Sequence, residues 1–229
     1  PYMVKRDGDR RALVLVTTDK GLCGALNTNL LRMVSDEFVT DDTKIVSAGR
    51  KGAQHAIRSG WDLAAEFSFG DPPTFAEARS ITKLAVDLFE SGAVDQVDIA
   101  FTNFVNTITQ NPEVHQLLPI AEIEGVQAGV EGEETSTALA GGATEFEFEP
   151  NAGDVLGQLL PHYINFKVHQ ILLESRASEH SARMVAMKNA TDNANQLIKD
   201  LTLEYNKLRQ AAITNELLEI TSAQMALGN

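Results

Sequence analysis

Residues 12–29 read ALVLVTTDKGLCGALNTN, and the class of fold follows from how this stretch is built. Its first six residues form a short apolar run, partly β-branched, which predicts a buried strand. The turn TTDKGLCG comes next, and a helical pattern then runs from about 25 to 38, with apolar residues three and four apart. A strand, a tight turn and a helix in this order indicate the start of an α/β unit.

The same alternation continues along the chain. It predicts further strands and helices at 44–48, 50–59, 61–67, 74–91, 96–105 and 113–119, with the last two strands placed around a turn at QNP (110–112). Thr74 and Glu77 have the spacing of a capping box at the start of the helix at 74–91. Gly60 is placed to end the helix at 50–59. Residues 1–150 are therefore expected to form an α/β, Rossmann-like, three-layer domain with a mainly parallel sheet.

The composition changes after residue 120. Residues 121–145 are rich in Gly, Glu, Ala and Thr, which is typical of a surface loop. The segment EFEFEP (145–150) alternates like a final strand that Pro150 ends.

Residues 151–229 are expected to form one long shaft helix. Pro161 is expected to kink or restart this helix, because proline cannot donate within the helical ladder. Roughly 60 residues of helix span about 90 Å. A compact α/β part would be only ~40 Å across, so the helix is expected to extend beyond it.

An apolar stripe runs along this helix at spacings of three and four, close to the heptad of a coiled coil. Its members are Met187, Ala190, Ala194, Leu197, Leu201, Tyr205, Leu208 and Ala212. A stripe of this kind needs a covering partner, which either a second chain or an earlier segment of the same chain supplies. The isolated chain is therefore predicted to self-associate through residues 187–217.

Composition narrows the range of functions. The net charge is −13 and the pI about 4.8, which argues against nucleic-acid partners and against adsorption to anionic lipid. No apolar run is long enough to span a bilayer. Cys23 is the only cysteine, so neither an internal disulfide nor a multi-cysteine metal site is possible.

The residues do not assemble into a catalytic, cofactor or metal site. The turn DKGLCG sits where a phosphate loop would lie, but the chain contains neither GxxxxGK[ST] nor GxGxxG. Cys23 has no motif that ties it to a base, and a small buried role is expected for it. His162, His169 and His180 could share a helix face, but no carboxylate ligands accompany them.

Four stretches resemble the gamma subunit of rotary ATP synthases, the central-stalk rotor. They are LVTTDKGLCGALNTN (15–29), GRKG (49–52), ASEHSARMVAMKNATDNANQLI (177–198) and YNKLRQAAITNELLEITSAQ (205–224). With the order of elements between them, the resemblance covers essentially the whole chain. It departs at Ala223 and Gln224, where the family usually has Gly–Ala.

Family members begin with a long N-terminal helix that winds antiparallel to the C-terminal one in a coiled coil. This chain begins where that helix should already have ended, and we expect it to come from a longer gene product. The chain has only Cys23, so it lacks the cysteine pair that gates chloroplast members, which favours a bacterial source.

The resemblance implies a non-catalytic rotor subunit without a cofactor. It would couple ion-driven rotation of the c-ring to conformational change in the catalytic beta subunits, with alpha, beta and epsilon subunits and the c-ring as partners. It implies a peripheral location on the cytoplasmic face of the bacterial plasma membrane. It also implies partner contacts at Arg183, Met184, Met187, Lys188, Arg209, Gln210, Thr214 and Glu216 on the helix, and at Phe148 and Glu149 near the c-ring.

Two alternatives remain open on the sequence. One is an α/β nucleotide-binding or hydrolytic enzyme with an unrecognised motif, which would bind ATP saturably. The other is a coiled-coil adaptor unrelated to rotary motors, which would not co-purify with alpha and beta subunits.

Overall fold

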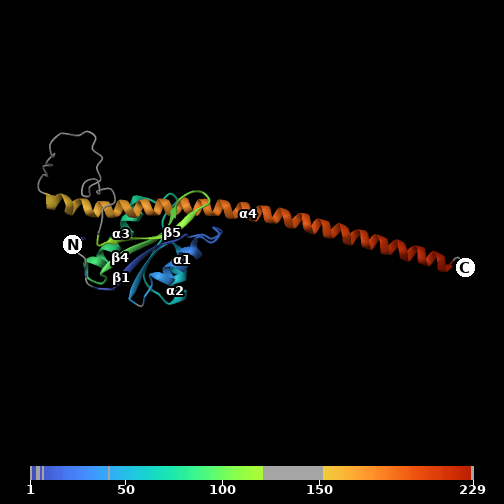
Figure 1. Ribbon diagram of the computed structural model, residues 1–229, viewed down its shortest axis with the longest axis horizontal. Coiled ribbons are helices and arrows are strands. Elements are labelled where there is room, and N and C mark those ends of the chain that lie inside the picture. The colour runs from blue at the N-terminus through green and yellow to red at the C-terminus, as the bar shows by residue number, and fades with distance from the viewer. Residues whose placement is uncertain (1, 4–5, 7, 41, 121–151, 228–229) are drawn as a thin grey trace, which may run out of the picture. The chain divides into compact units, whose positions relative to one another are not determined.

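The computed structural model describes residues 2–3, 6, 8–40, 42–120 and 152–227 (Figure 1). The chain divides into two units, Pro1–Arg183 and Met184–Asn229. The predicted loop at 121–145, the predicted strand at 145–150, and Phe148 and Glu149 within it lie outside the described residues.

A five-stranded sheet forms the centre of the first unit, in the order β3-β2-β1-β4-β5. β1 pairs in parallel with β2 and β4, β2 pairs in parallel with β3, and β5 joins the edge antiparallel to β4. The strands are β1 (Arg11–Val16), β2 (Thr43–Ala48), β3 (Asp62–Phe67), β4 (Gln96–Phe104) and β5 (Gln110–Leu118). The predicted mainly parallel sheet is confirmed.

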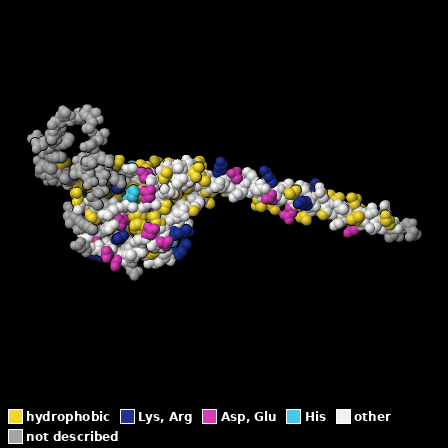
Figure 2. All heavy atoms as spheres, in the orientation of Figure 1, with side chains coloured by type: hydrophobic (Ala, Val, Ile, Leu, Met, Phe, Trp, Pro, Cys, Tyr) yellow, Lys and Arg dark blue, Asp and Glu magenta, His cyan; other side chains and the backbone are white. Residues whose placement is uncertain are grey.

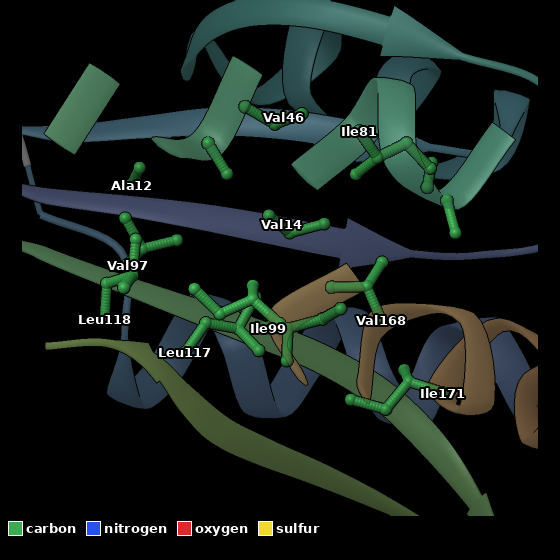
Figure 3. Close-up of a cluster of buried hydrophobic side chains, with 14 of the residues drawn as sticks. Ala12, Val14, Val46, Ile81, Val97, Ile99, Leu117, Leu118, Val168 and Ile171 are labelled. Atoms are coloured by element: carbon green, nitrogen blue, oxygen red, sulfur yellow. The ribbon is translucent and has the colours of Figure 1, made fainter. Parts of the chain in front are cut away.

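Helices cover both faces of this sheet, as a three-layer fold requires. They are α1 (Leu26–Glu37), α2 (Arg50–Ser59), α3 (Phe75–Glu90) and α4 (Ala152–Leu227). One core layer joins the sheet to α3 and α4, and Figure 3 shows Val14, Ile81, Ile99 and Val168 meeting in it. The other core layer packs side chains of α1 and α2 against the strand residues that point to the opposite face of the sheet, such as Leu13. Alternate residues of one strand face opposite layers, which explains the unbroken apolar run of β1.

Short-range signals in the sequence are confirmed. The Thr74 hydroxyl accepts from the Glu77 N–H at 3.3 Å, and the Glu77 carboxylate accepts from the Thr74 N–H at 2.7 Å, which completes the capping box. Gly60 ends α2 in the left-handed conformation at φ 74°.

The predicted restart of the helix at Pro161 and the predicted turn at Pro112 are wrong. α4 runs through Pro161 as one helix, and the side chains of Leu160 and Ile164 are buried on either side of the proline. Pro112 does not mark a turn, since it lies within β5 opposite Thr102. β5 is an edge strand, and an edge strand tolerates proline because some of its N–H groups need no ladder partner.

Asp98 is a buried carboxylate of β4 and leads to a prediction about pH. It is 4% exposed and accepts two bonds from the Gln96 amide, at 2.8 and 3.0 Å. Burial raises the pKa of Asp98. Stability is therefore expected to fall as pH rises from the unfolded-state pKa through the raised folded-state pKa, where the buried group must ionise. Asp98→Asn should remove this loss and raise the free energy of unfolding at pH 7 by about 1 kcal/mol.

Urea unfolding at pH 5 and pH 7 measures this effect, with the exposed Asp36→Asn on α1 as the control. The control should match the wild type at both pH values. An Asp98→Asn chain that is less stable than the wild type at pH 7 would contradict the account.

Candidate functional site

Two of the quoted stretches meet at the carboxyl edge of β1 and β2. The Thr17 hydroxyl accepts from the Gly52 N–H at 2.8 Å and donates to the Gly49 carbonyl at 3.3 Å. The Asp19 carboxylate accepts from the Arg50 N–H at 3.0 Å. The turn after β1 and the GRKG segment are therefore joined by their own hydrogen bonds.

Both glycines of GRKG are needed for close approach. Gly49 has φ 115°, and a Cβ there would lie 2.1 Å from the Thr17 carbonyl oxygen. A Cβ at Gly52 would lie 2.7 Å from the Ser47 hydroxyl. Packing between chain segments therefore explains both glycines, and a phosphate ligand is not needed to explain them.

Asn27 organises the turn that precedes α1. Its amide oxygen accepts from the Thr18 N–H at 3.2 Å, and its amide nitrogen donates to the Thr18 hydroxyl at 2.7 Å. The same nitrogen lies 3.4 Å from the sulfur of Cys23, which is 3% exposed. The expected small, buried role of Cys23 is confirmed.

The crevice where a doubly wound fold binds a nucleotide is filled by α4. That crevice lies at the carboxyl ends of β1 and β4, where the strand order reverses. There the Ser178 hydroxyl donates to the Thr102 carbonyl at 3.0 Å, and Glu179 is buried beside it. The cavity that remains measures about 10 Å³, room for about one water molecule and far too little for a nucleotide. The nucleotide-binding alternative thus loses its expected site.

The three histidines of α4 share a face, as their spacing predicts, and they contact the protein itself. His162 and His169 pack against the Phe75 ring, with centroids 6.1 and 5.6 Å away. His180 Nε2 lies 2.8 Å from the Asp71 carboxylate, and this hydrogen bond lowers the pKa of Asp71. In the part of the chain that the structure describes, no group of metal-ligating side chains occurs.

The predicted contact residues on α4 are accessible, with one exception. Arg183 is held by the Glu179 carboxylate and its side chain is 25% exposed. The others are exposed: Met184, Met187, Lys188, Arg209, Gln210, Thr214 and Glu216. They do not gather into one patch, because residues 183–216 occupy about 50 Å of helix at 1.5 Å per residue.

The described residues of the second unit are the C-terminal part of α4 alone, and their apolar side chains are uncovered. Between Met187 and Met225, every described side chain except Asn206 is exposed. Figure 2 shows apolar side chains along this helix between basic and acidic ones. The large exposed apolar residues include Leu197, Ile198, Leu201, Leu203, Tyr205, Leu208, Ile213, Leu217, Leu218 and Ile220.

An additional exposed stripe lies within the first unit, and sequence reasoning missed it. Leu159, Phe166 and Leu173 of α4 are 53%, 56% and 41% exposed and lie seven residues apart. A search at heptad spacing that began before residue 187 would have found them. Among the described residues, no helix is long and apolar enough to cross a membrane.

An α/β domain with a filled ligand crevice and a long helix whose apolar stripe lies uncovered defines a protein that acts through contact with other chains. The chain matches the family described as ATP synthase over residues 1–227. It is 46% identical to the ATP synthase gamma chain of Opitutus terrae, covering 99% of this chain and 77% of the relative. It is 43% identical to that of Cupriavidus necator, covering 99% and 78%. The chain belongs to the ATP synthase gamma chain family.

Solved structures agree on the fold. A chain of the Tetrahymena thermophila mitochondrial ATP synthase central stalk and c-ring superposes with a TM-score of 0.60 at 26% identity, over 79% of this chain and 76% of that one. A chain of the Euglena gracilis mitochondrial ATP synthase superposes with a TM-score of 0.68 at 21% identity, over 94% and 72%.

Proposed function

We propose that this chain is the central-stalk rotor subunit of an ATP synthase. In this role it couples ion-driven rotation of the c-ring to conformational change at the catalytic beta subunits, in synthesis and in hydrolysis of ATP. The observation that carries the proposal is the uncovered apolar and charged surface of α4 from Met187 to Met225, in a chain of the gamma family.

The proposed mechanism is a bias on conformational equilibria by contact alone. A rotor surface that differs from side to side can favour a different state in each surrounding subunit, and turning it moves that preference from one subunit to the next. The filled crevice at β1 and β4 fits a subunit that binds no nucleotide itself.

The proposed partners are the alpha, beta and epsilon subunits and the c-ring. The proposed location is the cytoplasmic face of a bacterial plasma membrane, reached through the c-ring. The gamma chains of Opitutus terrae and Cupriavidus necator support a bacterial enzyme. We assign the beta contacts to Arg183, Met184, Met187, Lys188, Arg209, Gln210, Thr214 and Glu216, and the contacts near the ring to Phe148 and Glu149.

The exposed residues of α4 at 187–193 are mostly small or polar, and the proposed rotor role accounts for this composition. Small residues such as Ala190 let another helix approach closely, and methionines such as Met187 adapt to changing neighbours. Polar residues such as Lys188 can move past the surface of a surrounding subunit without binding it permanently.

Co-purification tests the proposal and separates it from the adaptor alternative. Alpha and beta subunits of the same organism, expressed with this gamma chain, are expected to form a stable complex that hydrolyses ATP. Recovery of the chain without alpha and beta, from cells in which both are soluble, would refute the proposal.

Self-association is the prediction for the isolated 229-residue chain. Burying the stripe over residues 187–217 against a second helix removes apolar surface from water, and each fully buried Leu contributes about 1.5–3 kcal/mol. We expect the sedimentation coefficient to rise with concentration, and we expect Leu201→Asp with Leu208→Asp to abolish the rise. The exposed Asp36→Asn chain serves as the control. A wild-type chain that sediments as a monomer at all concentrations would rule this out.

A further inference from the structure

One face of α4 contacts the loop between β3 and α3, residues 68–74. His169 Nε2 lies 3.3 Å from the Pro73 carbonyl oxygen, and His180 reaches Asp71 from farther along the helix. Arg176 lies between the two histidines, seven residues after the first and four before the second, so all three side chains point the same way.

Arg176 makes more contacts with this loop than either histidine. Its Nη2 donates to the Phe69 and Gly70 carbonyls at 2.7 and 3.1 Å, and its Nε lies 3.3 Å from the Gly70 carbonyl. The guanidinium also lies over the Phe69 ring at 4.5 Å, and Asp19 of the turn after β1 is 3.7 Å away. The side chain is only 11% exposed, so water competes little for these donors.

Glu179 holds the guanidinium in this orientation. One oxygen of its carboxylate accepts from Arg176 Nη1, and the other accepts from Arg183. The Glu179 side chain is 4% exposed, and pairing with two guanidinium groups offsets the cost of burying its charge. The Arg176 side chain is therefore fixed on one side by the loop and on the other by its own helix.

The apolar contacts of α4 hold the helix against the sheet. Ile164, Val168 and Leu172 are buried against the sheet and resist separation of the helix from it. Turning the helix about its own axis would expose these side chains, so their burial also opposes rotation. Hydrogen bonds to two backbone carbonyls are directional and add to this resistance.

We propose that Arg176 is a positioning residue that fixes the rotational register of α4 on the α/β domain, so that torque passes between them with little slip. The proposal rests on the proposed rotor function. In this proposal, the Arg176 side chain transmits a load on the loop at Phe69 and Gly70 to the helix.

The test uses the assembled complex with Arg176→Lys in the gamma chain. Lysine keeps the charge, but its three N–H donors radiate from one nitrogen and lack the planar fork that reaches the loop carbonyls on one side and Glu179 on the other. Lysine also lacks the planar surface that stacks on Phe69. A probe on the α/β domain reports angular fluctuations while the rotor is stalled without ATP. The angular variance is expected to rise about twofold, since several directional charge-assisted bonds are lost. Arg79→Lys on α3 is the control, because Arg79 is exposed and has no ion pair among the described residues.

A second variant, Glu179→Gln, leaves the Arg176 charge but weakens its anchor, and its variance should also rise. Wild-type variance in both variants, with or without a loss of thermal stability, would overturn the proposal. A failure of the rotor function itself is distinguishable, because the wild-type complex would then not rotate when ATP is added.

Discussion

ATP-driven ion pumping is expected to fall about tenfold when Arg209→Glu and Glu216→Lys are combined in the gamma chain of the full complex. A tenfold fall corresponds to a loss of ~1.4 kcal/mol of contact energy with the beta subunits. The two residues lie seven apart, on one face of α4, and both are exposed. Neither forms an ion pair within the described part of the chain, so reversal should leave the helix intact. Membrane vesicles that hold the complex allow pumping and ATP hydrolysis to be measured together.

A matched control comes from the same helix. Asp192→Lys with Lys199→Glu reverses another exposed pair at the same spacing of seven and leaves the net charge unchanged. Pumping in this control should stay near the wild-type level, and circular dichroism should show equal helix content in both variants. Normal pumping with both Arg209 and Glu216 reversed would refute their assignment as beta contacts.

Gly49→Ala is expected to have the largest effect on the stability of the domain, about 3–5 kcal/mol of unfolding free energy. Alanine at φ 115° is strained, and its Cβ would lie 2.1 Å from the Thr17 carbonyl oxygen. The backbone cannot yield easily, because the Gly49 N–H donates to the Phe67 carbonyl at 2.8 Å and the Gly49 carbonyl accepts from the Ser47 hydroxyl at 2.8 Å.

Gly60→Ala separates the steric part of this effect from the dihedral part. Gly60 has φ 74°, but no atom lies within 4 Å of the Cβ that alanine would add. We expect only about 1 kcal/mol of destabilisation there. Urea unfolding of the three chains decides the matter, and equal losses for the two variants would contradict the close-contact explanation.

Local patterns predicted most of the fold correctly. The apolar run of β1 and the capping box at Thr74 depend on residues a few positions apart, so they can be read from sequence. Proline led to two wrong predictions, a turn at Pro112 and a restart of the helix at Pro161. An edge strand tolerates proline because some of its N–H groups need no partner, and α4 is packed on both sides of Pro161. These compensations come from tertiary contacts that no short window of sequence contains.

The contacts of the site were harder to predict for the same reason. Arg176 binds carbonyls 106 and 107 residues away, and no periodicity encodes that pairing. The meeting of Thr17 with Gly49 follows from the parallel register of β1 on β2, which sets Val16 opposite Ala48. The accessible contact residues of α4 came from resemblance to the gamma family, because exposure alone does not distinguish Arg209 from the other charged residues of the helix.

Rotation of the domain inside the assembled complex tests the central claim most directly. The alpha and beta subunits are fixed to a surface, and a probe is attached to the α/β domain of the gamma chain at Arg58, an exposed position at the end of α2 changed to cysteine. Addition of ATP is expected to produce continuous rotation of the probe in one direction, in steps that stop when ATP is removed. A probe that stays still, or that only diffuses back and forth while the same complex hydrolyses ATP, would contradict the account.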